Sequence, residues 1–231
     1  MTDTLQQAWQ TASANLWAMR DEIWQAFWET LVMLGISSAV SIIGGLLVGV
    51  ALFMTSKNQL AERAGAYTAL GGLTNLIRAF PFVILMIVLI PLTRLLAGTT
   101  IGPIAASVAL SLAGLFYFAR LVEQNLRDVP RGVIEAAQAM GASHGTIVRH
   151  VLLNEARASL VLSATTLMIS LLSYSAAAGM IGGGGLGDLA IRYGYNRYQN
   201  DVMIFMVILL VLMVVVIQTV GNLLAAKLDK R

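Results

Sequence analysis

The sequence TLVMLGISSAVSIIGGLLVGVALFMTS, residues 30–56, contains no charged side chain. About 20 apolar residues are enough for an α-helix to cross a hydrocarbon core of roughly 30 Å. Residues 95–119, 158–187 and 202–226 form three more uncharged runs of sufficient length. With 58% hydrophobic and only 12% charged residues, the chain cannot form an ordinary water-exposed surface. The sequence therefore predicts an all-α fold, a polytopic membrane helical bundle.

A fifth, shorter span is expected at about residues 79–96, where Arg78 and Arg94 can reach the two interfaces from its ends. Residues 64–77 are uncharged too, but their glycines favour an interpretation as the approach to this span. Arg78, beside Pro81, is interpreted as an end anchor rather than a substrate ligand. The prediction is five transmembrane helices.

The basic residues predict the orientation of these spans. With the amino terminus outside, eleven of the 15 Lys and Arg residues fall on the cytoplasmic side, in agreement with the positive-inside rule. The residues left outside are Arg20, Arg94, Arg192 and Arg197. The carboxyl terminus and the loop at about 128–157 are then cytoplasmic. Topology also explains the net charge of +3 without a nucleic-acid partner.

All four tryptophans lie in the first 28 residues: Trp9, Trp17, Trp24 and Trp28. Apolar residues recur there at three- and four-residue steps, which predicts an amphipathic helix. Residues 1–28 are interpreted as a helix on the outer membrane interface, ahead of a transmembrane domain at 29–231. Packing on neighbouring helices is the alternative. The absence of a basic n-region argues against a cleaved signal peptide.

Small residues form a stripe within the first span, because Ser37, Ser41, Gly45 and Gly49 fall on every fourth position. Small side chains allow the backbones of two membrane helices to approach closely. The stripe predicts a helix interface, within the chain or between subunits. The alternative is that glycine is simply frequent in membrane helices.

The glycine-rich stretch at 182–187 matches G-x-G-x-x-G. A dinucleotide site would need a preceding strand, whereas an apolar helix precedes this stretch. We interpret it as a helix terminus and turn at the outer face. The polar, aromatic residues that follow predict a surface for an external partner, or else an ordinary interfacial belt. The candidate surface residues are Arg192, Tyr193, Tyr195 and Arg197.

Enzymatic chemistry finds no support in the sequence. No Gly-Lys dipeptide is present, so the chain has no Walker A motif for ATP. The two histidines, His144 and His150, do not share a helix face, and there is no cysteine, so no metal site is expected. No nucleophile, base and oxyanion donors can be combined into an active site. We therefore expect no cofactor and no enzymatic activity in this chain.

The polar loop at about 128–157 also carries apolar residues at helical spacing, interrupted at Gly141. The first short amphipathic helix is marked by Val133, Ile134, Ala137 and Met140, and the second by Ile147, Val148, Val151 and Leu152. Such a pair is stable only against its own spans or in a partner's groove. Glu135 can pair with a basic group of a partner, so the loop predicts a docking site.

The segment Glu135-Ala136-Ala137, followed by Gly141, resembles the signature loop of permease subunits of type I ABC importers. From about residue 29 to 231 the chain is similar to the methionine-importing branch. This similarity is carried by Arg78-Ala79-Phe80-Pro81-Phe82, Ile134-Glu135-Ala136-Ala137, Ala139-Met140-Gly141-Ala142, Tyr174-Ser175-Ala176, and Gly184-Gly185-Leu186-Gly187 with Tyr193-Gly194-Tyr195.

The resemblance implies a homodimer in a bacterial inner membrane, two cytosolic ATP-binding subunits that hold ATP and Mg²⁺, and an external binding protein, in some cases a lipoprotein. It assigns coupling to the ATP-binding subunits to Glu135, Ala136, Ala137, Met140, Gly141, Ile147 and Leu152. The signature often ends in Leu-Pro, but this chain has Leu153-Asn154. The second coupling helix need not stop there.

Polar and small residues in the fourth long run are the candidate pathway: Ser173, Tyr174, Ser175, Ala177 and Met180. Our hypothesis is that Tyr174 and Met180 gate the path near the two-fold axis; helix packing by small residues is the alternative.

Two other functional classes fit less well. An ion-coupled secondary transporter should show ionisable residues at mid-membrane, and the four long runs contain none. A membrane-embedded enzyme would need acid, base or metal-binding side chains that converge at the bilayer face, and the sequence indicates no such set. Methionine is implied by resemblance alone, and another amino acid or small solute remains an alternative because a separate binding protein can set the specificity.

Overall fold

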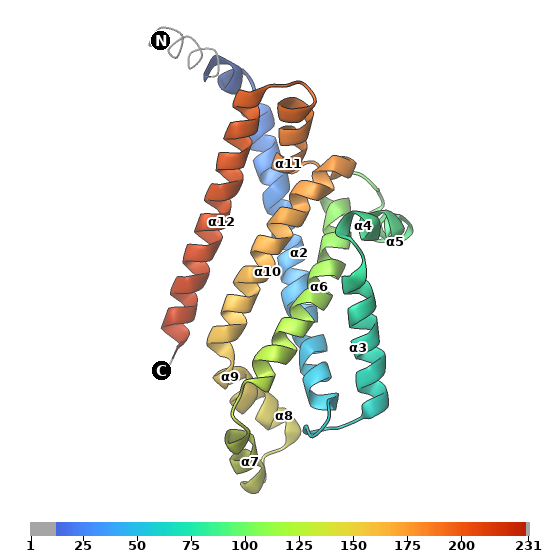
Figure 1. Ribbon diagram of the computed structural model, residues 1–231, viewed down its shortest axis with the longest axis vertical. Coiled ribbons are helices and arrows are strands. Elements are labelled where there is room, and N and C mark those ends of the chain that lie inside the picture. The colour runs from blue at the N-terminus through green and yellow to red at the C-terminus, as the bar shows by residue number, and fades with distance from the viewer. Residues whose placement is uncertain (1–12, 230–231) are drawn as a thin grey trace.

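The computed structural model describes residues 13–229 as a bundle of helices, with no strand in that range (Figure 1). Four of its helices, α2, α6, α10 and α12, are long and apolar enough to cross a membrane. The predicted all-α membrane bundle is confirmed. The helices are α2 (Arg20–Thr55), α3 (Ala64–Ala79), α4 (Phe82–Val88), α5 (Ile90–Ala97), α6 (Pro103–Arg127), α7 (Arg131–Ala139), α8 (His144–Thr146), α9 (Leu153–Glu155), α10 (Arg157–Ala178), α11 (Gly185–Leu189) and α12 (Asn200–Leu228), with π-helical segments at Ile147–Leu152, Gly179–Gly183 and Ala190–Tyr195.

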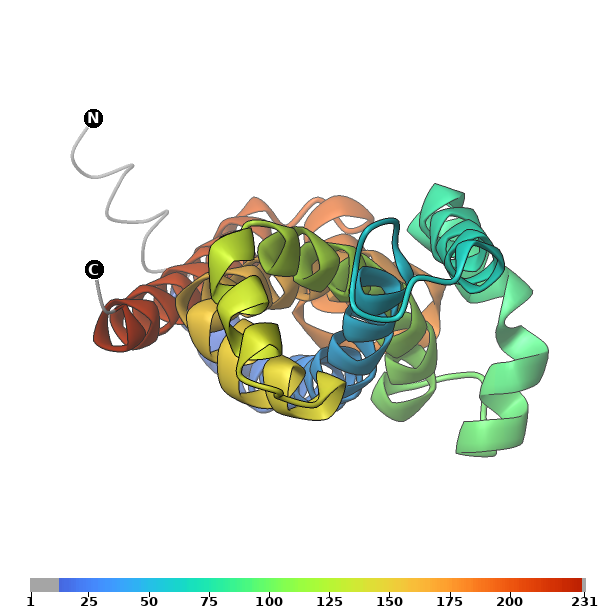
Figure 2. The same cartoon turned by 90° about the horizontal axis from the view of Figure 1, so that it is seen from below.

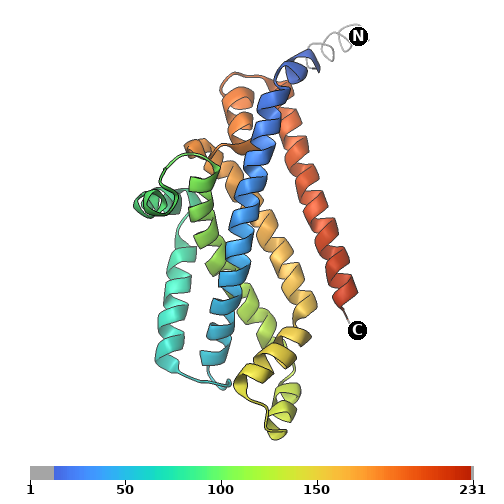
Figure 3. The same ribbon diagram turned by 180° about the vertical axis from the view of Figure 1, so that it is seen from behind.

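Helix α2 runs the length of the bundle and packs against α6 and α10 (Figure 3). Helix α3 lies along α6 on one side, and α12 lies along α10 on the other. We call the end that carries the 128–157 loop the loop end, and the opposite end, where α2 begins, the far end. Figure 2 views the molecule from the loop end, with α3 to α5 set off to one side of the bundle.

The stripe of small residues on α2 faces α6. Ser41 Oγ donates to the Ser111 carbonyl oxygen at 3.0 Å. A Cβ added to Gly49 would lie 2.6 Å from the carbonyl oxygen of Ala119, closer than such atoms can approach. The predicted helix interface is therefore confirmed, and it lies within the chain.

Replacing Gly49 by valine is expected to force α2 and α6 apart. Overpacking of this kind costs about 1–3 kcal/mol. Thermal unfolding of the detergent-purified protein measures the loss. Gly35→Val is the matched control, because Gly35 lies on the same helix with nothing within 4 Å of its added Cβ. Equal melting temperatures for the two variants would contradict the close contact.

Five transmembrane helices are possible if the bent pair α3 and α4 counts as one span, but the position expected for the fifth span, residues 79–96, is wrong. Helix α3 ends at Ala79 because Phe80, which precedes Pro81, adopts an extended conformation. Helix α4 then turns by 106° relative to α3, and the helix breaks again at Leu89, just before Pro91. Residues 64–77, taken as an approach segment, instead form α3 itself.

Two boundaries change with this correction. The long helix α6 begins at Pro103, so residues 95–102 do not belong to that span. Arg78 lies near the end of α3 that is remote from the loop end, with its guanidinium 5.9 Å from the Tyr117 ring centroid. It therefore cannot be counted with the basic residues of the loop end.

The amino-terminal prediction falls partly outside the described residues, which do not include Trp9. Residues 13–18 are helical, Met19 interrupts them, and α2 then continues unbroken from Arg20 to Thr55. Residues 20–28 thus share one helix with the first span. Trp17, Trp24 and Trp28 are exposed. Their location at a membrane interface stays a prediction.

Candidate functional site

The loop between α6 and α10 folds as two helical segments around Gly141, as the spacing predicts. Helix α7 ends at Ala139, and Gly141 follows with φ of +80°, a conformation that suits glycine. The Ser143 side chain then accepts a hydrogen bond from the Thr146 N–H at 3.3 Å and caps the second segment. That segment runs through α8, the π-helical turns and α9 to Glu155.

The predicted coupling residues divide into two groups. Ala137, Ile147 and Leu152 are buried in the same apolar cluster as Met33 and Phe53 of α2. They therefore hold the loop onto the chain's own core. The members that a partner can reach are Glu135, Ala136, Met140 and Gly141. Met140 is a large apolar side chain with 81% of its surface exposed.

Asn154 does not end the second segment. The helix breaks two residues later at Ala156 (ψ of 1°), and α10 begins at Arg157. Arg157 Nη1 donates to Asn154 Oδ1 at 3.4 Å, and its Nε donates to the Leu228 carbonyl oxygen at 2.8 Å. The second bond joins the start of α10 to the end of α12. Asn154 therefore helps to orient the arginine that links the two helices.

The candidate pathway residues occupy the last turns of α10 and the π-helical turn after it. The Tyr174 ring stacks on Phe82, at the start of α4, with centroids 4.9 Å apart and planes 11° from parallel. Ser173 and Ser175 donate to carbonyl oxygens of their own helix, at Ile169 and Leu172. Met180 is 65% exposed. Tyr174 and Met180 are thus the two large side chains of this set that reach the surface.

Tyr174→Ala is expected to remove the stack on Phe82, a contact worth about 0.5–1.5 kcal/mol beyond the buried area. If the stack holds α4 against the pathway, the variant should alter uptake, whereas Tyr174→Phe keeps both rings and should not. Solute uptake into vesicles, normalised to the amount of protein, distinguishes them. Uptake that is unchanged in both variants and in Met180→Ala would contradict the gate hypothesis.

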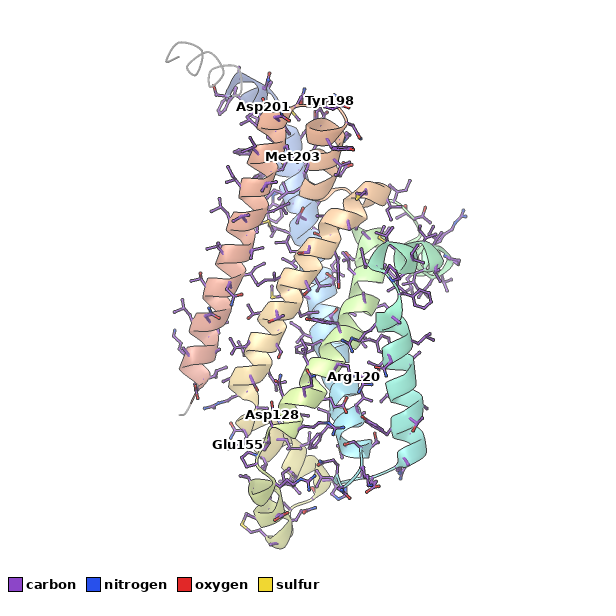
Figure 4. The ribbon with its side chains drawn as sticks, in the orientation of Figure 1. Arg120, Asp128, Glu155, Tyr198, Asp201 and Met203 are labelled. Atoms are coloured by element: carbon purple, nitrogen blue, oxygen red, sulfur yellow. The ribbon has the colours of Figure 1, made fainter. Side chains whose placement is uncertain are left out.

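The predicted external surface is an ordered cluster. Tyr193 lies beneath two guanidinium groups, those of Arg197 at 4.3 Å and Arg192 at 5.4 Å from its ring centroid. Its Oη donates to Glu22 on α2 at 2.8 Å, and this hydrogen bond raises the pKa of Tyr193. Tyr195 is exposed. Tyr198 is exposed beside it, at the top of the molecule in Figure 4.

A pair of salt bridges within α6, joined to α3 by hydrogen bonds, was not predicted. Glu123, only 3% exposed, accepts from Arg120 at 2.5 Å and from Arg127 at 2.8 Å. Tyr67 of α3 donates to the same carboxylate at 3.2 Å, and Arg120 donates to Asn75 of α3 at 2.9 Å. Figure 4 marks Arg120 on the side of α6 that faces α3. The i, i+3 and i, i+4 spacing of these charges in the sequence could have indicated the two salt bridges.

Four long apolar helices, with a loop anchored to the core at one end and a glycine-rich turn after α10 at the other, define a membrane-spanning transport subunit. The chain belongs to the family of binding-protein-dependent transport system inner membrane components, which matches residues 48–231.

Two curated relatives match this chain over almost their whole length. A Vibrio cholerae protein named probable D-methionine transport system permease protein MetI is 44% identical over 91% of this chain and 94% of its own. The Bacillus subtilis methionine import system permease protein MetP is 40% identical over 91% of this chain and 95% of its own length. A chain from an inward-facing structure of the MetNI methionine ABC transporter, 40% identical, superposes with a TM-score of 0.90 over 92% of this chain and 99% of that one.

Proposed function

We propose that this chain is the permease subunit of an ATP-driven importer that carries methionine across a bacterial inner membrane. The observation that carries the proposal is the match to the MetNI chain, which covers nearly all of both chains at 40% identity. Relatives from Vibrio cholerae and Bacillus subtilis, both named for methionine transport, point to the same solute.

Coupling to two cytosolic ATP-binding subunits is proposed to occur on the exposed face of the loop, around Glu135 and Met140. ATP and Mg²⁺ would be bound by those subunits, and a second copy of this chain would complete the pathway. The loop end would be cytoplasmic and the amino terminus external, which is supported by the basic residues at the loop end. An external binding protein would then meet the far end around Tyr195 and Arg197.

Reconstitution tests this proposal. The chain, its ATP-binding subunit and its binding protein are placed in proteoliposomes, and uptake of labelled methionine is measured with ATP and Mg²⁺, with other amino acids as competitors. ATP-dependent uptake that unlabelled methionine suppresses is the expected result. Suppression by a different amino acid would contradict methionine as the transported solute. Uptake driven by an ion gradient alone would favour the secondary-transporter alternative.

A further inference from the structure

The glycine-rich turn after the pathway segment is held by two neighbouring side chains of α2. Gly184 and Gly185 both have positive φ, 75° and 85°, so the turn needs glycine at these positions. The Gly185 N–H donates to Glu29 Oε2 at 2.8 Å. The Leu186 N–H donates to Thr30 Oγ1 at 2.9 Å. Residues 156 positions apart in the sequence are thereby joined.

The carboxylate of Glu29 is itself oriented. Gln25, one turn earlier on α2, donates from Nε2 to Glu29 Oε1 at 2.9 Å, so both carboxylate oxygens accept from amide donors. A hydrogen bond to an ionised carboxylate is roughly twice as strong as one between neutral groups. Thr30 is held as well, because its hydroxyl donates to the Ala26 carbonyl oxygen at 2.9 Å.

The turn has little room to move. A Cβ added to Gly185 would lie 2.7 Å from Thr30 Oγ1, and one added to Gly179 would lie 2.5 Å from the backbone nitrogen of Asp188 in α11. On its other side, the Gly182 carbonyl oxygen accepts from the Gly102 N–H, just before α6, at 2.8 Å. The turn is thus fixed between α2 and α6, directly after Met180.

We propose that Glu29 is a positioning residue for the pathway. Its carboxylate, with Thr30, holds the 182–187 turn on α2 and so keeps Met180 and the end of α10 in place at the far end. Loss of the carboxylate frees the Gly185 N–H and lets the turn leave α2. This role rests on the proposed function, since it assumes that the end of α10 lines the transport path.

A single thiol can report this movement, because the chain contains no cysteine. Met180→Cys places the thiol at an exposed position beside the turn. The complete importer carrying this change is reconstituted in vesicles, and a membrane-impermeant maleimide is added on the far-end side. The rate of labelling is compared between this parent and derivatives that also carry Glu29→Ala, Glu29→Gln, Thr30→Val or Glu22→Ala.

Glu29→Ala and Thr30→Val are expected to raise the labelling rate at least about tenfold, the change that 1.4 kcal/mol of lost stabilisation produces. Glu29→Gln should stay near the parent rate, because its amide oxygen still accepts from the Gly185 N–H. Glu22→Ala is the matched control: it removes a carboxylate from the same helix, but one that accepts from Tyr193 instead of the turn.

Parent-like labelling in both Glu29→Ala and Thr30→Val, at wild-type abundance, would overturn the proposal. An equal rise in Glu22→Ala would also overturn it, because the far end would then be loosened as a whole. Thr30→Val preserves the shape of the side chain and tests the proposal even if Glu29→Ala does not accumulate. Labelling requires no transport, so a wild-type complex without methionine uptake would contradict the proposed function alone.

Discussion

Glu135→Arg is expected to abolish capture of the ATP-binding subunit and, with it, ATP-dependent uptake. Glu135 is exposed on α7, so the substitution leaves the buried face of the loop intact. Reversing the charge removes an attraction to a basic group on the partner and adds a repulsion. Truncating one member of a close interfacial charge pair costs about 2–5 kcal/mol, and 1.4 kcal/mol is already tenfold in affinity.

Co-purification of the two subunits from detergent extracts measures the loss. Glu155→Arg is the matched control, because it makes the same charge reversal at an exposed carboxylate of the same loop. Figure 4 places Glu155 near Asp128, at the junction with the long helices. Capture that is equally weakened in the control would indicate a general charge effect, and retained capture in Glu135→Arg would remove Glu135 from the docking surface.

Glu123→Ala should have the largest effect on stability. It leaves Arg120, whose side chain is only 17% exposed, without its carboxylate partner, and removing one partner of a buried pair costs about 3–5 kcal/mol. Arg127, 44% exposed, can be hydrated instead and adds little to this cost. In a chain of this size 1 kcal/mol corresponds to about 2–4 °C, so the apparent melting temperature should fall by roughly 6–20 °C. Thermal unfolding of purified protein measures it.

Glu62→Ala provides the comparison for this loss. Glu62 is exposed near the same end of the bundle, and its carboxylate accepts only a backbone hydrogen bond from Asn58 at 2.9 Å among the described contacts. Its replacement should change the melting temperature little. A similar small change in Glu123→Ala would show that the salt bridges and hydrogen bonds of Glu123 contribute nothing to the fold.

Local signals in the sequence predicted most of the fold. The free energy of transferring a helix from water into the membrane depends mainly on its composition. The four long spans could therefore be found from their uncharged runs. The position of the fifth candidate span could not be found in this way. Pro81 and Pro91 break residues 79–97 into two short helices, and the glycines of α3 are compatible with a helix that packs along α6. The small-residue stripe predicted a contact but not its partner.

The docking loop was predictable in outline for the same reason. Helical spacing located its two segments and Gly141 between them. It could not show that Ile147 and Leu152 turn toward the core while Met140 stays open, since that depends on where α2 lies. Glu29 was missed because its partner Gly185 is distant in sequence. Glu123 was missed because Arg120 and Arg127 were counted only for the charge balance across the membrane. The coupling assignment itself stays a prediction.

The burial of Ile147 and Leu152 has a mechanical consequence. Both side chains belong to one continuous packed cluster with Leu110 of α6, Leu171 of α10 and Met33 of α2. A close-packed interior has no slack, so a push on the loop is not absorbed by bending of a tether. We therefore expect a displacement of the loop at Glu135 to move α6 and α10 as rigid helices.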